Sequence, residues 1–554
     1  MPRICLYADE VSPGNQLRHE STRKIQILYW AFKQGPGVHV DQLWFTLGLA
    51  RSDRVNKVKG GMSAFVKAAL MLFVEPHDVR AGFQIRINDE TYIRFANWTT
   101  FIADENALKE AFDFKGASGI HCCPMCVNIV TESSDLHHWN ASLRPSTCIN
   151  QNEWILQTNN GVRDNLQFLT SRMGAATKKQ WEDLTKTIGW NLNPYGLLGF
   201  GLPGELDIQP ISMIQFDYMH ILIVSGVWNH ELGALLPKLK QAGFSQADLH
   251  EYLQGFKWPK QQGSHAASGK NIFRKQQSGH IKCSASEALG VFGVVRLFLS
   301  QHMDKFEAIR DEVASYMKLC EVFDVIQACK NNFKSASDLH HAIHGFVTAH
   351  LKAWGSELWL PKHHYLQHLP WMLHNHSNVM SCFVHERKHR VAKRFAENLR
   401  FVGDHFDTSI LKDVIYCNIQ DLGNKEIIQE GIVKPVDADP ALTHAIQLAL
   451  GLQAGDHVQY GFDCRYSFGA LASADDFVLF TIDGERLLGQ VQSFIGSGRE
   501  VYAHLRVWKP QGHNMFKKSE GNMLLCEVSL IEDVVTYTTL APDKMLVVPT
   551  SLHC

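Results

Sequence analysis

One stretch near the N-terminus constrains the fold more than any other. Residues 92–103 are rich in aromatic and β-branched side chains and run into the carboxylate of Asp104, which is typical of a β-strand that delivers an acid to the edge of a sheet. A Cys-x-x-Cys pair, Cys123 and Cys126, follows after a short gap. The carboxylate needs further carboxylates to hold a divalent ion, and the thiol pair needs two more sulfur or nitrogen ligands to hold zinc.

The segment up to residue 105 has the periodicity of a small α/β sheet. Its runs predict five strands and one helix: strands at 4–9, 24–32, 42–49, 83–87 and 92–103, and a helix at 63–73. With the short run at 83–87 set aside, the order is β-β-β-α-β, and Asp9 and Asp104 end the first and the last strand. These two strands are neighbours in an RNase H-like mixed sheet, so we expect the two carboxylates to meet.

Composition limits the remaining possibilities. The chain has 554 residues, of which 45% are hydrophobic and 20% charged, and this predicts several folded domains. Its formal net charge is −2, so any nucleic-acid surface must come from local basic patches. No apolar run approaches the length of a membrane span. The odd number of cysteines, 13, with no leader peptide ahead of them, favours reduced thiols in the cytosol or nucleus.

Changes in the hydrophobic pattern along the chain predict four regions. They are a first part of the RNase H-like sheet at 1–115, a zinc-linked and mainly helical insertion at 116–360, a return to the core at 361–435, and a small β-barrel-like domain at 455–554.

A third carboxylate is expected on a helix of the returning segment. Cleavage of a phosphodiester by two Mg²⁺ or Mn²⁺ ions requires hard oxygen ligands from about three acids. Glu386 fits this role together with Asp9 and Asp104, because its helix also carries basic side chains suited to a DNA backbone. Those side chains are Lys388, Arg390, Lys393 and Arg394. The alternative is that the two Asp form strand-end turns and Glu386 pairs with a lysine.

The second half of a zinc site is expected among paired histidines. His364 and His368 would lie on one face of a helix, and His363 is the alternative ligand to His364. Asp217 and His220 form an Asp-x-x-His set that could bind a further ion, or Asp217 could simply cap a helix.

These motifs occur in the order found in one known family. The chain resembles the CACTA (En/Spm-like) DDE transposases of the RNase H-like transposase and integrase superfamily. The similar segments are residues 7–15 around the first Asp, 98–104 before the second, Cys123–Cys126, the Asp-x-Met-His-Ile of 216–221, the His-x-x-x-His-Leu-Pro of 364–370, and Glu386-Arg387.

The resemblance implies a metal-dependent enzyme that cleaves and joins DNA strands. It implies catalytic roles for Asp9, Asp104 and Glu386 with two Mg²⁺ or Mn²⁺ ions, Asp217 being the rival of Asp104. It also implies a structural Zn²⁺ on the four Cys and His ligands. The resemblance further implies that the protein acts as a homodimer in the nucleus, away from membranes, and that its partners are transposon ends and target DNA.

One departure from the family qualifies that expectation. The chain begins almost on the first strand, so the DNA-binding region expected ahead of it is missing, as in a truncated or domesticated copy. The alternative function is therefore a catalytically inactive, transposase-derived protein that binds DNA or chromatin. The C-terminal β domain loosely resembles a bromo-adjacent-homology or SH3-like module, which would suit that function.

Overall fold

The computed structural model divides the chain into two compact units. The first comprises Met1–Leu222 and Ala328–Asn424, and the second Ile223–Gln327 and Lys425–Cys554. The structure describes residues 2–13, 23–34, 38–75, 78–199, 206–260, 272–274, 276–277, 279–330, 334–399, 401–423, 431–453, 456–466, 470–498, 500–512 and 514–549. Within these ranges, no helix has both the length and the apolar character that crossing a bilayer requires.

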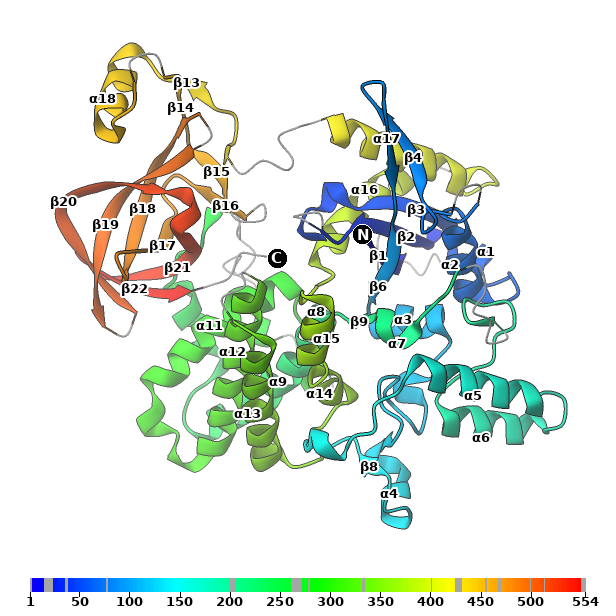
Figure 1. Cartoon of the computed structure of the whole chain (residues 1–554). Coiled ribbons are helices and arrows are strands. Elements are labelled where there is room, and N and C mark those ends of the chain that lie inside the picture. Colours follow the sequence, from blue (N-terminus) through cyan, green and yellow to red (C-terminus); the bar gives the residue numbers. More distant parts are fainter. Residues whose placement is uncertain are drawn as a thin grey trace. The chain divides into compact units, whose positions relative to one another are not determined.

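A five-stranded mixed sheet organises the first unit (Figure 1). Its order is β3-β2-β1-β6-β9. Strands β1, β2 and β3 are antiparallel neighbours, whereas β1, β6 and β9 run parallel. The bounds are β1 Arg3–Val11, β2 Ile25–Phe32, β3 Phe45–Arg51, β6 Asn97–Ala103 and β9 Ile214–Phe216.

Alternation along β1 and β2 determines which helices cover each face of this sheet. On one face Tyr7 stacks on His385 of α16 (Phe383–Asn398), with ring centroids 3.7 Å apart. On the other face Trp30 contacts Phe73 just beyond α2 (Gly61–Met71), and Phe101 contacts Phe112 of α3 (Glu105–Phe112). The sheet is therefore covered on both sides, and its central strands are almost completely buried.

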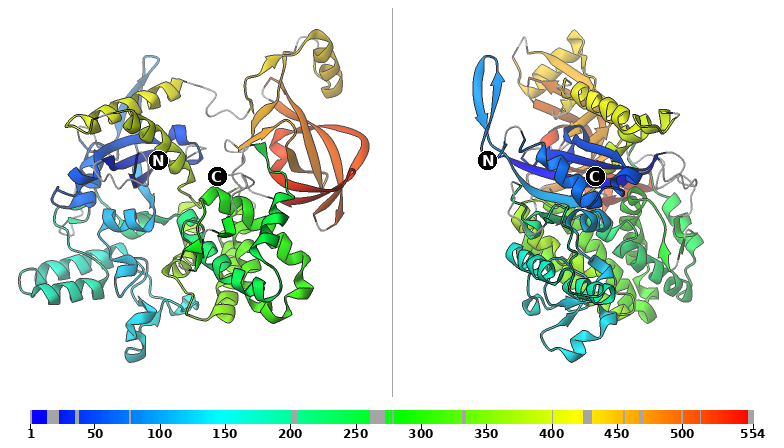
Figure 2. Two further views of the ribbon diagram at one scale, coloured as in Figure 1. Left: turned by 180° about the vertical axis from the view of Figure 1, so that it is seen from behind. Right: turned by 90° about the vertical axis from the view of Figure 1, so that its right-hand side faces the viewer.

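The expected mixed sheet is present, with two differences in detail. The strand predicted at 92–103 is two strands, because β5 (Glu90–Arg94) pairs with β4 (Phe83–Ile87) in a separate hairpin and β6 starts only at Asn97. This hairpin extends away from the sheet in both views of Figure 2. Strand β9 was not predicted, because three residues are too few to show alternation. The Pro13-Gly14-Asn15 run also predicts a turn after β1, but Gly14 and Asn15 lie outside the described residues.

Helices and short strands fill the rest of the first unit. Their bounds are α1 Ser52–Val55, β7 Ile129–Val130, α4 Leu136–Trp139, β8 Arg144–Pro145, α5 Asn159–Arg172, α6 Lys178–Ile188, α7 Pro210–Met213, α8 Tyr218–Leu222, α13 Ala336–Trp354, α14 Pro361–Leu366, α15 Leu369–His376 and α17 Phe406–Gly423.

The second unit joins helices to a β-barrel. The helices and short strands before the barrel are α9 Val227–Gln241, α10 Gln246–Gln254, β10 Gln276–Gln277, β11 His280–Ile281 and α11 Ala285–Gln301, followed by α12 Arg310–Lys330, which runs on into the first unit. Two backbone hydrogen bonds between Lys257 and Tyr537, of 2.7 and 3.0 Å, attach the helical part to a barrel strand. The region predicted as one insertion at 116–360 is thus shared between both units.

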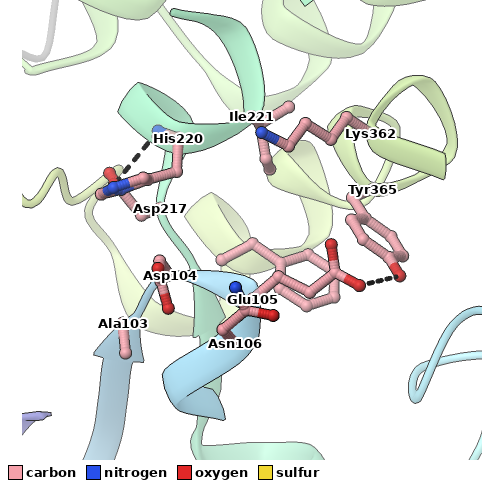
Figure 3. A pocket seen from close by; sticks show the side chains of 10 residues that line it. Ala103, Asp104, Glu105, Asn106, Asp217, His220, Ile221, Lys362 and Tyr365 are labelled. Carbon is pink, nitrogen blue, oxygen red and sulfur yellow. Dashed lines mark hydrogen bonds and ion pairs between the residues drawn. The ribbon is translucent and has the colours of Figure 1, made fainter. Parts of the chain in front are cut away.

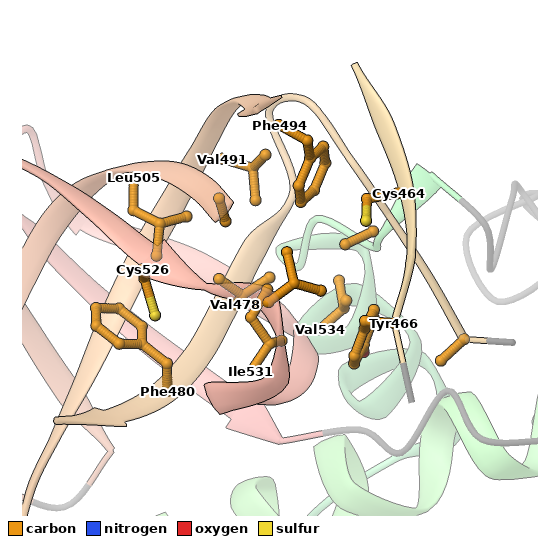
Figure 4. Packing of buried hydrophobic residues seen from close by; sticks show 14 of the residues in the cluster. Cys464, Tyr466, Val478, Phe480, Val491, Phe494, Leu505, Cys526, Ile531 and Val534 are labelled. Atoms are coloured by element: carbon orange, nitrogen blue, oxygen red, sulfur yellow. The ribbon is translucent and has the colours of Figure 1, made fainter. Parts of the chain in front are cut away.

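Six long strands close the barrel, because β18 pairs with both β17 and β19. The bounds are β17 Phe477–Ile482, β18 Glu485–Ser497, β19 Glu500–Gly512, β20 Met515–Glu527, β21 Ile531–Ala541 and β22 Lys544–Pro549. The accessory elements are β12 Gly431–Ile432, β13 Val436–Asp437, α18 Pro440–Leu450, β14 Val458–Gly461, β15 Asp463–Tyr466 and β16 Ala470–Ser473. Side chains such as Phe480, Val491 and Leu505 fill the interior (Figure 4). Gly489 is needed there, since a Cβ would lie 2.8 Å from Leu505. The predicted C-terminal barrel is confirmed.

Candidate carboxylate site and Cys/His cluster

Three aspartates lie side by side where the parallel strands end. The strand register pairs Tyr7 with Ile102 and Ala103 with Phe216, so continuing it places Asp9 opposite Asp104, and Asp104 opposite Asp217. Neighbouring strands are only about 4.8 Å apart. We call Asp9, Asp104 and Asp217 the carboxylate row. Sheet topology alone therefore brings three acids together at one edge.

Asp9 is held by aromatic and histidine side chains from the buried face of the sheet. Its Oδ2 accepts a hydrogen bond from the Tyr7 hydroxyl at 2.7 Å and lies 3.2 Å from Nε2 of His389. The Tyr29 hydroxyl lies 3.2 Å from the other ring nitrogen of His389. Burial alone would raise the pKa of Asp9, but the hydrogen bonds and charge of His389, with the Tyr7 bond, hold it below its usual value. Asp9 is thus fixed as an ionised acid, and its side chain keeps 22% exposure.

Asp104 is less constrained than Asp9, and its carboxylate is repelled by the neighbouring negative charges. It caps α3, with Oδ1 accepting from the backbone N–H of Ala107 at 2.7 Å. Among the described residues, Oδ2 receives no hydrogen bond. Burial is the main reason that the pKa of Asp104 is raised, and the charges of Asp9 and Asp217 add to it. A cation placed here would relieve this repulsion.

Asp217 differs, because its side chain is fully buried and both of its oxygens are already in use. Oδ1 accepts from the backbone N–H groups of Met219 and Cys382, each at 3.0 Å. Oδ2 accepts from the backbone N–H of His220 at 3.1 Å and also contacts its Nδ1. Cys382 precedes α16, so Asp217 joins the end of β9 to the start of the Glu386 helix. Asp217, His220 and Cys382 could also enclose a metal ion, but these bonds would have to be displaced.

His220 lies beside Asp104 in a small pocket of about 110 Å³ (Figure 3). Lys362 and Tyr365 line the same pocket. Burial acts against a charged His220, but the hydrogen bond and charge of Asp217, with the charges of Asp104 and Asp9, raise its pKa to about 8. The pocket thus places a histidine side chain next to the carboxylate row.

Glu386 lies near the row but in an exposed position. Its backbone N–H bonds to the carbonyl of Cys382, which places it in the first turn of α16. Burial raises the pKa of Tyr7 well above its usual value, and the charges of Asp9 and Glu386 raise it further. Glu386 is therefore close to the phenol that holds Asp9, while its own side chain remains open to solvent.

One of the basic residues expected on a DNA-binding face is buried. Lys388 is 2% exposed and falls on the stripe of α16 that packs inward, together with His385, His389 and Ala392. Burial also lowers its pKa. The prediction that Lys388 contacts a DNA backbone is wrong, because positions 385, 388, 389 and 392 share the inner face of the helix. Arg390 and Arg394 are exposed and Lys393 is half-buried.

The Cys/His cluster consists of Cys123, Cys126, His364 and His368, whose ligand atoms all lie within 4.8 Å of one another. Sγ of Cys123 and of Cys126 each lie 3.4 Å from Nε2 of His368, and Cys126 Sγ lies 3.5 Å from Nε2 of His364. The two Nε2 atoms are 3.2 Å apart. Ordinary zinc bond lengths in a tetrahedron give edges of roughly 3.3–3.6 Å. The four side chains fit such an ion.

Burial favours the uncharged forms of the cluster side chains when no cation is bound. All four residues are buried, and Trp154 covers the rings of His364 and His368 at 4.6 and 5.2 Å. Burial lowers the pKa of His364 well below its usual value, which keeps it in the neutral form that binds metals. Burial, together with the neighbouring Cys126, raises the pKa of Cys123 well above its usual value. Burial therefore favours a protonated Cys123, and a thiolate form would be stable here only beside a cation.

His363, the alternative ligand, points elsewhere. Its ring lies 4.2 Å from that of His350 and 4.9 Å from that of Trp359. Cys122 contributes its backbone rather than its thiol, because its carbonyl accepts a 2.5 Å hydrogen bond from Tyr365. The ring of Tyr365 packs on Phe216, next to Asp217. The Cys/His cluster therefore supports the end of β9.

Sequence reasoning missed the groups that hold Asp9. In the sequence, Tyr7 and Tyr29 fall within the predicted strands, and His389 lies among the basic residues of the predicted Glu386 helix. A usable signal was present, because His385 and His389 are four apart on one helix and flank Glu386 in sequence.

Comparisons with known proteins do not identify the chain. No family model matches it, and no curated protein matches it either.

Proposed function

We propose that the first unit is a metal-dependent enzyme that cleaves DNA strands and joins them, a DDE transposase with an RNase H-like core similar to the CACTA class. The catalytic acids in this proposal are Asp9, Asp104 and Glu386. Asp217 is assigned a positioning role, because its oxygens are taken by four hydrogen bonds whereas Asp104 keeps an open oxygen.

The observation that carries the proposal is the sheet itself. The order β3-β2-β1-β6-β9, antiparallel on one side and parallel on the other, supports an RNase H-like core. Its register sets Asp9 and Asp104 side by side, although about 95 residues separate them. If Asp9 and Asp104 were only turn residues at strand ends, nothing would require their strands to pair in this register. Nor would one of the two acids need its own Tyr and His partners.

The donor set suits Mg²⁺ or Mn²⁺. Asp9, Asp104 and Glu386 offer hard oxygen ligands, and the mutual repulsion at Asp104 favours a cation. When bound, such ions would activate the attacking oxygen and stabilise the leaving oxygen. The protein's own contribution is to fix Asp9 through Tyr7 and His389, and to set the start of the Glu386 helix through Asp217.

Zn²⁺ is the ion proposed for the Cys/His cluster, in a structural role. The four ligands fill a tetrahedron and leave no open position, as in structural zinc sites. The cluster would hold α14 and α15 against the strand end at Phe216 and thereby stabilise the carboxylate row.

The test is strand cleavage by the full chain. Supercoiled plasmid DNA incubated with the protein and Mn²⁺ should be nicked, and Asp9→Asn, Asp104→Asn and Glu386→Gln should each remove the activity. Asp164→Asn, an exposed acid on α5, and Glu397→Gln, an exposed acid on α16, are matched controls that should cleave normally. Cleavage by the three variants at the wild-type rate would refute the site.

An inactive, DNA-binding derivative is the outcome to expect if nicking is absent. It predicts retention of DNA that weakens with salt but no metal-dependent cleavage. The resemblance of the barrel to a chromatin-binding module stays a prediction.

A further inference from the structure

We infer that His220, oriented by Asp217, is a further catalytic residue that accepts the proton of the attacking water. This inference rests on the proposed strand cleavage and adds to it a residue outside the three metal-binding acids. It is carried by the hydrogen bonds of His220 and by the place of its side chain.

The hydrogen bonds of His220 fix its tautomer. Nδ1 contacts Oδ2 of Asp217, a carboxylate that can only accept, so Nδ1 carries a proton. Among the described residues, Nε2 makes no hydrogen bond. A carboxylate that holds one ring nitrogen protonated leaves the other with a lone pair, and this is how general-base histidines are oriented.

The position of His220 matches that role. It lines the pocket beside Asp104 and keeps 19% side-chain exposure, so its ring is not sealed from solvent. The groups that face it are the carboxylates of Asp9, Asp104 and Asp217, the thiol of Cys382 and, across the pocket, Lys362. The acids favour an imidazole that receives a proton, because they stabilise the imidazolium which forms.

Asp217 has the features of an orienting group rather than a reactive one. It is fully buried, and three backbone N–H groups, those of Met219, His220 and Cys382, bond to its carboxylate and hold its orientation. A purely structural Asp-His pair would not need its histidine to line a pocket beside Asp104.

The proposed step balances without any further reactant. The water oxygen forms a bond to phosphorus while the bond from phosphorus to the 3′-oxygen breaks. The proton of the water passes to Nε2 of His220, and the departing 3′-oxygen takes a proton from solvent. His220 then returns its proton to solvent.

The first experiment compares nicking of supercoiled plasmid by wild type, His220→Gln, His220→Ala and Asp217→Asn in Mn²⁺. Loss of a general base predicts a fall of roughly 100-fold or more in His220→Gln. It also predicts loss of the rise in rate with pH that wild type shows, and partial rescue of His220→Ala by free imidazole. Mn²⁺ affinity measured by calorimetry should remain unchanged in His220→Gln but fall in Asp104→Asn. Weaker Mn²⁺ binding in His220→Gln, or cleavage at the wild-type rate, would overturn the inference.

A second experiment does not depend on cleavage. Diethyl pyrocarbonate acylates the free lone pair of an imidazole, and peptide mass spectrometry locates the product. His220 should react increasingly as the pH rises, and in Asp217→Asn it should react at lower pH, because a carboxylate charge has been removed. Exposed His405 is the internal reference. If His405 reacts and His220 does not at any pH, Nε2 is not available and the inference fails, even if wild type cleaves DNA. If His220 reacts as expected but wild type cleaves no DNA, the proposed function has failed instead.

Discussion

The Cys/His cluster and the carboxylate row lie in the same unit and are built in opposite ways. In the cluster, four buried side chains approach one another at 3.2–3.5 Å and aromatic rings cover them. In the row, Asp9 is partly exposed and Asp104 has an oxygen without a hydrogen bond. If each holds metal as proposed, the first arrangement would use all four of its ligands on one ion, whereas the second would keep positions for substrate. Closed and open sites of this kind are the mark of structural and reactive metal centres respectively.

The largest expected effect is the loss of stability that follows disruption of the Cys/His cluster. Cys126→Ser should unfold the first unit or lower its melting temperature strongly, because structural zinc contributes on the order of 10 kcal/mol in small zinc domains. Wild type should contain zinc, and a strong chelator should reproduce the effect in a thermal melt. Cys148→Ser, a cysteine outside the cluster, is the control. Equal melting of the two variants would show that the cluster is not a metal site.

In the carboxylate row, loss of a proposed ligand should reduce activity without reducing stability. Asp104→Asn should reduce cleavage by at least about 100-fold, because it removes an ion ligand. It should leave the melting temperature unchanged or raised, since the raised pKa of Asp104 means that its charge destabilises the folded state, and Asn still caps a helix. Cleavage and thermal melts on the same samples check both parts. A marked loss of stability would indicate that Asp104 is structural.

A smaller effect is expected from the support of Asp9. Tyr7→Phe removes a hydrogen bond to an ionised acid and should cost about 1–2 kcal/mol of unfolding free energy at neutral pH without divalent ions. The folded pKa of Asp9 is lowered, so this stabilisation is present above its usual pKa of 3.8 and is lost as the pH falls through the folded value. Urea unfolding across this range measures it. Tyr29→Phe, which contacts His389 and not Asp9, should lose stability with much less dependence on pH.

The smallest effect concerns the basic face of α16. Arg390→Ala should weaken DNA binding modestly and reduce the slope of log affinity against log salt by about one. Lys388→Met should leave that slope unchanged, because the side chain is buried. Fluorescence anisotropy with a labelled duplex over a salt series distinguishes the two. A larger effect from Lys388→Met would contradict the assignment of the faces.

The parts of this arrangement that could be predicted from sequence are those with strong local periodicity. Strands β1, β2, β3 and β6 are visible in the sequence as apolar runs. The Cys-x-x-Cys and His-x-x-x-His spacings indicate the members of the Cys/His cluster. The break between β5 and β6 is not visible, because residues on both sides have the same β-forming character. The choice between His363 and His364, and the inward direction of Lys388, depend on how helices pack on their neighbours. Such tertiary choices leave no local pattern in the chain.

The most direct measurement for the central claim is a crystal structure of the full chain grown with Mn²⁺ and recorded at the manganese absorption edge. The account predicts anomalous density between Asp9 and Asp104, within ligand distance of Glu386, and a separate zinc ion among Cys123, Cys126, His364 and His368. Manganese bound elsewhere, with the carboxylates of Asp9 and Asp104 contacting no ion, would contradict it.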